Sequence, residues 1–184
     1  MTATPELDRF HDGLREEYRE LLAIVSAYDQ RLLVIKGWGV TLSLANLGFG
    51  FQQDHYGLFL VAALSGLAFW VLEATTKLHQ TRYYPRMGDI EVLSYELFSV
   101  PVERGRASTP LIDWGWTTAR QRLRRPRHRE APMDPHTPTP RPNVLTGSPM
   151  RPWLWPHVML PHAISVVAGI VLFVLGLAGV FGPI

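Results

Sequence analysis

Three long apolar stretches constrain what this chain can fold into. Leu33–Phe51 contains one charged residue, Lys36, whereas Leu58–Leu72 and Ile164–Pro183 contain none. A helix needs about 20 apolar residues to cross the hydrocarbon core of a bilayer, and a helix of a soluble domain normally keeps a polar face. Because residues 164–184 offer no polar face, we predict three membrane-spanning helices and not three buried helices of a soluble all-α domain.

The rest of the chain divides around these stretches. Nine of the fifteen prolines lie between Pro126 and Pro156, a composition that cannot bury a core and that is typical of a tether or of a docking strip for another protein. The predicted fold is an all-α integral membrane protein with an amphipathic cytoplasmic helix (1–32), a transmembrane hairpin (33–76, helices about 33–52 and 56–75), a cytoplasmic segment of short helices (77–125), a proline-rich linker (126–156) and a third transmembrane helix (157–182).

Basic residues predict the orientation of the chain. The segment from Lys77 to Arg151 holds thirteen of the eighteen Lys and Arg residues, and the N-terminal segment holds four more. The hairpin turn and the end of the chain hold none. Cytoplasmic loops are the ones enriched in Lys and Arg, so we expect a multi-pass protein of the plasma (inner) membrane with its N-terminus inside and its C-terminus outside.

Two charges stand near the same end of the predicted hairpin. Lys36 and Glu73 lie at similar distances along the chain from the expected turn near His55, so a rise of 1.5 Å per residue carries them to similar depth. A charge inside a membrane normally finds a partner or water. We therefore expect Lys36 and Glu73 to pair, either across the hairpin or across a subunit interface, unless each reaches the headgroups independently.

Small residues recur at helical spacing in all three stretches. Such residues let helices approach closely in lipid, and asparagine can hydrogen-bond across the contact. Three roles are open: packing within one subunit, packing between subunits, and the lining of a pore. The residues expected at these contacts are Gly39, Ser43, Asn46, Gly50, Ala62, Gly66, Gly169 and Gly176.

The N-terminal segment carries a heptad-like apolar seam. Thr4 and Pro5 form a typical helix start, and apolar residues then recur at alternating spacings of three and four, a pattern typical of helices that associate. This seam either binds another chain or packs on the protein's own segment after Lys77. Its members are Leu7, Phe10, Leu14, Tyr18, Leu21, Val25, Tyr28 and Leu32.

A basic run and a tryptophan pair favour contact with lipid headgroups. The run follows an aromatic cluster, and each basic residue near an anionic surface contributes about 1 kcal/mol; the same run could simply fix the topology. It lacks a surrounding nucleic-acid-binding fold, which argues against nucleic acid as a partner. The headgroup residues are Arg120, Arg122, Arg124, Arg125, Trp153 and Trp155.

Motifs that would indicate catalysis or a cofactor are not found. The chain has no cysteine, which excludes disulfides and thiolate sites, and it has no Walker-type loop, His-Glu-x-x-His or nucleophile elbow. His157 and His162 are five residues apart, a poor spacing for a shared metal on one helical face. We therefore expect a non-enzymatic protein without a catalytic, cofactor or metal site.

The order of segments over residues 1–98 resembles the SLATT-type two-helix membrane modules of bacterial conflict systems. The matching parts are YRELLAIVSAYDQRLLVIKGWG, the turn QQDHYG and ATTKLHQTRYYPRM. The proline-rich linker and the third crossing depart from that pattern. The resemblance implies an oligomerising effector that perturbs the membrane.

Two functions follow from these observations. The first is a self-assembling membrane protein, with a pore-forming or membrane-perturbing effector as its strongest form, and its partners are lipids and further copies of the chain. The alternative is an accessory or scaffold subunit of a larger membrane protein complex.

Overall fold

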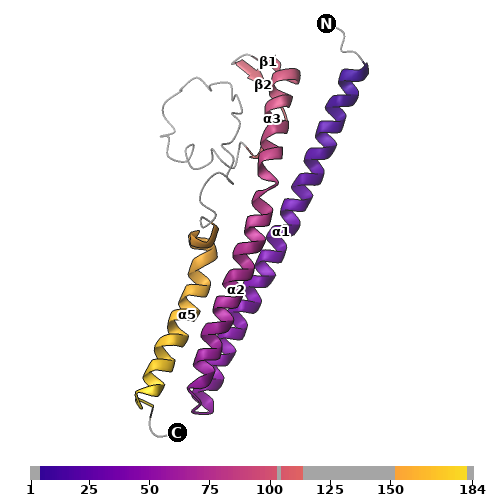
Figure 1. Cartoon of the computed structure of the whole chain (residues 1–184). Coiled ribbons are helices and arrows are strands. Elements are labelled where there is room, and N and C mark those ends of the chain that lie inside the picture. The colour runs from indigo at the N-terminus through magenta and orange to yellow at the C-terminus, as the bar shows by residue number, and fades with distance from the viewer. Residues whose placement is uncertain (1–4, 103–104, 114–151, 182–184) are drawn as a thin grey trace. The chain divides into compact units, whose positions relative to one another are not determined.

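The computed structural model describes residues 5–102, 105–113 and 152–181. Most of these residues are helical (Figure 1). The helices are α1 (Pro5–Gln52), α2 (Gly57–Thr81), α3 (Tyr84–Phe98) and α5 (Pro156–Leu177), with a short 3-10 helix, η2 (Pro152–Leu154), before α5. The strands β1 (Val100–Val102) and β2 (Gly105–Ala107) form an antiparallel pair.

Three helices are long and apolar enough to cross a membrane: α1, the helical region that begins at Gly57, and α5. The expected apolar helices near 33–52, 56–75 and 157–182 are thus present as helical segments. Helix α1 runs without a break from the charged N-terminal segment into the first apolar stretch.

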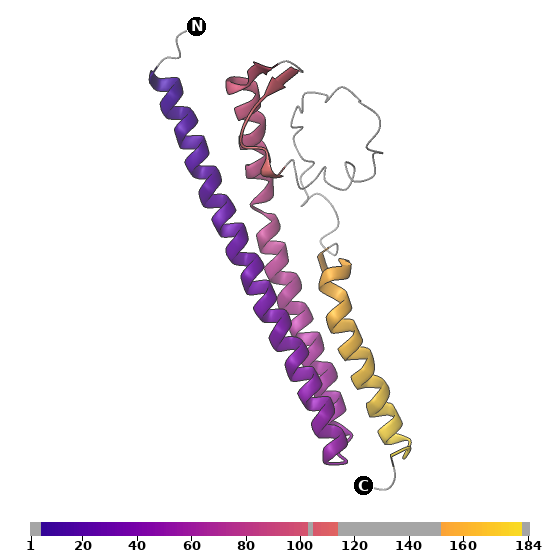
Figure 2. The same ribbon diagram turned by 180° about the vertical axis from the view of Figure 1, so that it is seen from behind.

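The chain forms two compact units. The described part of unit 1 comes from the start of α1, up to Ser26, and from Thr81 onward through α3 and the β-hairpin. The described part of unit 2 holds the remainder of α1 from Ala27, helix α2 up to Gln80, and η2 with α5. Within unit 2 these three helices lie side by side, as both views show (Figures 1 and 2).

Unit 1 has a small core where α1 packs on α3. Leu14, Tyr18 and Val25 of α1 are buried against Met87 and Ile90 of α3. Three members of the heptad-like seam therefore pack on the protein's own segment after Lys77, which is one of the two alternatives that the seam allowed. Leu7 and Phe10, the first two members, remain exposed.

Unit 1 combines one short helix with a pair of strands. Helix α3 begins at Tyr84, and Pro85 occupies its first turn, where a missing N–H costs nothing. The segment expected to be wholly helical also contains the β1–β2 hairpin, in which Val100 pairs with Ala107. β-Branched residues beside a proline favour extended backbone here.

Helix α5 ends five residues before the predicted boundary at residue 182. Gly179 has a φ of +72°, and its N–H donates to the carbonyl of Gly176 while the N–H of Val180 donates to the carbonyl of Leu175. This pair of bonds is the Schellman arrangement, which requires a left-handed residue after the helix. Gly179 is therefore a helix stop.

Candidate functional site

A buried carboxylate joins the three helices of unit 2. Glu73 of α2 is 2% exposed, and its Oε1 lies 3.1 Å from Nζ of Lys36 on α1. Its Oε2 lies 2.8 Å from Nε2 of His162 on α5, which is 1% exposed. The pairing of Lys36 with Glu73 across the hairpin is thus present within one chain, and His162 is a third member that the sequence analysis did not identify.

The hydrogen-bond roles at this site follow from its chemistry. An ionised carboxylate only accepts hydrogen bonds, so His162 donates its Nε2–H to Glu73. Lys36 also donates to the backbone carbonyl of His157 at 2.7 Å. The Glu73 carboxylate of α2 therefore accepts from a donor on α1 and a donor on α5, and the Glu73–Lys36–His162 site joins the three helices.

A tryptophan bond adds to the contact between α2 and the start of α5. The indole Nε1 of Trp70 donates to the backbone carbonyl of Trp153 at 3.1 Å. Trp153 is half-buried, and the ring of Trp155 lies 5.5 Å from that of His157. The two tryptophans expected at lipid headgroups thus lie just before the start of α5, close to the charged site.

The small residues predicted at helix contacts pack within the chain. A Cβ added to Gly39 would lie 2.8 Å from the Cβ of Phe69, and one on Gly169 would lie 2.6 Å from the carbonyl oxygen of Phe59. Gly66 faces Ser165 and Val166 in the same way. These contacts bring α1, α2 and α5 close together. The small residues predicted at helix contacts, called the small-residue stripe below, therefore pack within one subunit.

The remaining members of the stripe have similar surroundings. Ser43 is buried and donates to the carbonyl of Ala62, itself buried, at 3.3 Å. Gly50 lies against the ring of Phe59, and Gly176 lies against Tyr56. Asn46 is half-buried and donates to the carbonyl of Leu42 in its own helix at 2.9 Å, so its described bond is local.

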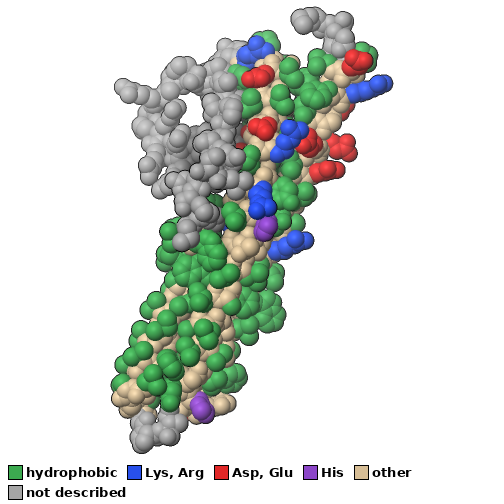
Figure 3. Space-filling model, viewed as in Figure 1, with side chains coloured by type: hydrophobic (Ala, Val, Ile, Leu, Met, Phe, Trp, Pro, Cys, Tyr) green, Lys and Arg blue, Asp and Glu red, His purple; other side chains and the backbone are tan. Residues whose placement is uncertain are grey.

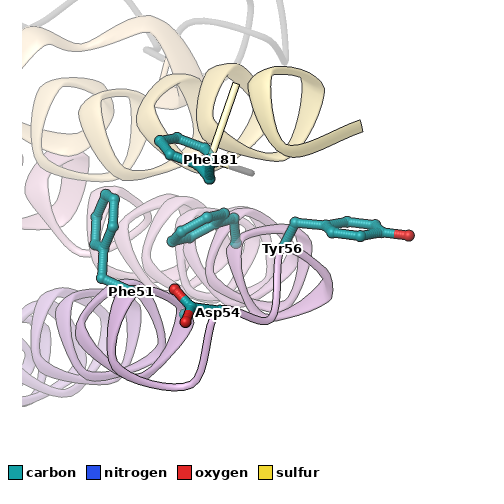
Figure 4. Close-up of a pocket in the computed structure, with 6 residues that line it drawn as sticks. Phe51, Asp54, Tyr56 and Phe181 are labelled. Atoms are coloured by element: carbon teal, nitrogen blue, oxygen red, sulfur yellow. The ribbon is translucent and has the colours of Figure 1, made fainter. Parts of the chain in front are cut away.

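A shallow pocket lies beside the turn between α1 and α2 (Figure 4). The rings of Phe51, Phe59 and Phe181 pack on one another with centroid distances of 4.9 to 6.0 Å. The Asp54 carboxylate lies at the edge, and the Tyr56 ring points away from the labelled phenylalanines. Ring contacts at this spacing stabilise the turn and leave little room for a ligand between them.

Unit 1 has a buried polar cluster of its own. Oε1 of Glu91 accepts hydrogen bonds from the hydroxyl of Tyr18 at 2.5 Å and from the backbone N–H of Asp113 at 2.6 Å. Burial, together with the neighbouring Glu91 carboxylate, raises the pKa of Tyr18 well above its usual range. The phenol therefore stays protonated and acts as a donor that ties α1 and the segment after β2 to α3.

A metal ion held by this chain, which has no cysteine, would need several His, Asp or Glu ligands. Among residues 5–102, 105–113 and 152–181, no group of three His, Asp or Glu side chains is arranged to hold a metal ion. The Glu73 site offers a carboxylate, an imidazole and an ammonium group that neutralise and bond one another. A comparison of the chain with models of known protein families, with curated proteins and with solved structures finds no match to any of them.

Two sets of predicted residues remain to be placed. The four headgroup arginines, Arg120, Arg122, Arg124 and Arg125, lie outside the described residues. His162 was missed because it was compared only with His157. The available signal was its position relative to Ser165 and Gly169, three and seven residues onward, which places it on the small-residue face of the third helix.

Proposed function

We propose that this protein is a non-enzymatic, multi-pass protein of the plasma (inner) membrane that serves as an accessory or scaffold subunit of a larger membrane protein complex. Its N-terminus would lie inside, and three helices would cross the bilayer. The observation that carries the proposal is that residues typical of helix association make their contacts within one chain. The small-residue stripe is occupied by contacts within the chain, and so are the seam members Leu14, Tyr18 and Val25.

Side-chain exposure supports the membrane part of the proposal. Large apolar residues stand exposed along the second half of α1, along α2 and along α5, among them Trp38, Leu64 and Ile164 at 56 to 67%. Figure 3 shows Lys, Arg, Asp and Glu gathered over the first half of α1 and over α3, while hydrophobic side chains dominate the visible face of unit 2. Lipid is the solvent that suits such a surface.

Exposed apolar residues on unit 1 support a docking role outside the bilayer. Phe10 of α1 and Leu97 of α3 are 47% and 50% exposed, and Leu7 and Val100 are also exposed. The ring of Phe10 lies 6.5 Å from that of Phe98, so residues from both helices contribute to this patch. Apolar patches rimmed by charged residues on a water-facing surface are typical of protein interaction sites.

The self-assembling effector remains a second candidate. The observation that favours it is the succession of a long helix, a tight turn and a returning helix in α1, α2 and α3, which resembles the layout of SLATT-type modules. In that case the patch around Phe10 and Leu97 would bind further copies of the chain, and the protein would perturb the membrane after assembly.

The composition of the native particle tests both candidates. The full chain is extracted gently from its membrane, and the particle is weighed by native mass spectrometry. We expect other chains to accompany it and to be lost from the variant Phe10→Glu, Leu97→Glu. The matched control Asp8→Asn, Glu96→Gln changes exposed neighbours and should retain them.

Two results would redirect the proposal. A particle of identical chains that dissociates in the same double variant would establish self-assembly, and ion flux across liposomes would then be measured. A monomer, or a particle that both double variants leave intact, would remove the docking role of the patch.

A further inference from the structure

The apolar patch on unit 1 draws on two helices. Phe10 of α1 and Leu97 of α3 are 47% and 50% exposed, and Leu93, one turn before Leu97, is half-buried on the same side of α3. The ring of Phe98 lies 6.5 Å from that of Phe10, so the start of α1 and the end of α3 are next to each other. Apolar side chains on two neighbouring helices form the kind of surface on which an amphipathic helix packs its apolar face.

Acidic side chains lie beside this patch. Glu6 is exposed one turn before Phe10 on α1, and Asp89 is exposed one turn before Leu93 on α3. Residues one turn apart share a helical face, so each helix places a carboxylate at the edge of the apolar surface. Glu6 and Asp89 are called the acidic rim below.

Arginines do not balance the acids of unit 1. Arg86 of α3 donates two hydrogen bonds of 2.7 Å to the exposed Glu17 of α1, so that pair adds no net charge. Among the residues that the structure describes in unit 1, Asp and Glu outnumber Arg and Lys ten to six. Two of the ten acids, Glu91 and Asp113, are buried. The described surface of unit 1 is therefore negative.

This negative charge selects among the surfaces that could cover the patch. Two copies of the chain that met through the same patch would bring like charges together. With the N-terminus inside, the nearest lipid surface is the cytoplasmic leaflet, which is itself negative. The chain's own basic run, Arg120–Arg125, is expected at lipid headgroups. A basic segment of a different chain is the occupant that gains from both the apolar contact and the opposite charge.

We propose that the patch around Phe10 and Leu97 binds a basic amphipathic helix of a partner subunit. The proposal rests on the scaffold role given above and names the chemistry of the partner: apolar side chains on one helical face, with lysine or arginine on its flanks. Opposite charge at the edge of an interface acts mainly on the rate of association and on its salt dependence. Binding should therefore weaken as ionic strength rises.

Two synthetic peptides of equal length test the class of partner. Both repeat leucine at spacings of three and four, and their remaining positions alternate glutamine with lysine in one peptide and with glutamate in the other. The fluorescence anisotropy of each labelled peptide is measured against the full chain in micelles of a non-ionic detergent, with empty micelles as the blank. We expect the lysine peptide to bind at least about tenfold more tightly at about 0.05 M salt, and the ratio to shrink at about 0.5 M salt.

Matched variants test whether the acidic rim is responsible. The rim variant is Glu6→Lys, Asp89→Lys. The rim control, Asp12→Lys, Glu16→Lys, makes the same change in charge at exposed positions on another face of α1. The rim variant should bind the lysine peptide at least about fivefold more weakly than the rim control. Circular dichroism checks that each chain remains helical.

A third variant tests the apolar contact. Phe10→Ser, Leu97→Ser, called the apolar variant, removes two exposed rings or branches without adding charge, and it should bind the lysine peptide at least about tenfold more weakly than the parent. Equal binding of the two peptides by the parent would overturn the proposal. So would equal affinities of the rim variant and the rim control, or an apolar variant that binds as the parent does.

The chain's own basic run is tested as the competing occupant. Its four arginines are replaced together by glutamine in the full chain. The proposal expects this chain to bind the lysine peptide as the parent does. Tighter binding that the apolar variant abolishes would assign the patch to the run and overturn the proposal. The four arginines are Arg120, Arg122, Arg124 and Arg125.

The composition of the native particle separates this inference from the scaffold role. A particle without other chains would refute the scaffold role and the inference with it. A particle whose other chains are lost from Phe10→Glu, Leu97→Glu, but are retained as firmly by the rim variant as by the rim control, would keep the scaffold role and overturn the basic partner. Loss of those chains from the rim variant and their retention by the rim control supports both.

Discussion

Replacing Gly169 by alanine should loosen α5, because no room exists for a methyl group at that position. The added Cβ would lie 2.6 Å from the carbonyl oxygen of Phe59, 2.8 Å from the backbone nitrogen of Ala63 and 2.9 Å from its Cβ. Two of these three atoms belong to the backbone of α2. The clash is therefore relieved only if α5 and α2 move apart.

Two opposing effects set the size of the loss. Overpacking a tight contact costs about 1–3 kcal/mol, whereas alanine in place of glycine in a helix gains about 0.5–1 kcal/mol. Subtracting the helix gain from the packing cost leaves a net destabilisation of about 0–2.5 kcal/mol. Gly48→Ala is the matched control, because it is also helical and a Cβ there meets no atom within 4 Å. It should be neutral or stabilising.

The stability of both variants is measured by reversible unfolding of the purified chain in mixed micelles, followed by circular dichroism. Gly169→Ala should unfold at a lower fraction of denaturing detergent than the parent, and Gly48→Ala should not. If Gly169→Ala proves as stable as Gly48→Ala, then α5 does not approach α2 as closely as described. The small-residue stripe would then not have the packing role given to it here.

Three further predictions concern the polar contacts. Glu91→Ala should destabilise unit 1 by about 1–3 kcal/mol, because the buried Tyr18 hydroxyl loses the acceptor of its hydrogen bond, and proteolysis of the region should accelerate. A hydrogen bond from Arg86 lowers the pKa of Glu17, and this exposed pair adds at most about 1 kcal/mol to the free energy of unfolding. That gain is present above the ordinary pKa of 4.5 and is lost as pH falls through the lowered value. Arg86→Gln should therefore match the parent in unfolding scans at low pH only. Trp70→Phe should remove the bond to Trp153 and cost about 1 kcal/mol in the same micelle assay.

Long periodic features of this chain were predictable from sequence. The apolar stretches and the heptad-like seam fix the identity of α1, α2 and α5, because hydrophobic periodicity is a strong signal over many turns. Counting along the hairpin brought Lys36 and Glu73 to one level, since helix rise is constant. The Lys36–Glu73 contact in the structure agrees with that reasoning.

Contacts between distant segments were harder to predict. The sequence does not state which face of the third helix meets the hairpin, so His162 could not be identified as a partner of Glu73. Glu91 and Tyr18 are 73 residues apart, and no local pattern joins a buried carboxylate to a phenol at that separation. The β1–β2 hairpin is only three residues long on each side, too short to produce a clear alternation.

The bond from Lys36 to the main-chain carbonyl of His157 has a consequence for how the sequence can diverge among homologues. A backbone oxygen is present whatever side chain follows it, so mutation at position 157 leaves this acceptor in place. Positions 36, 73 and 162 have no such freedom, because each contributes its side chain to the same charge balance. In a set of diverged sequences, residue 157 should therefore vary freely, while a change at any one of the other three should be accompanied by a change at another.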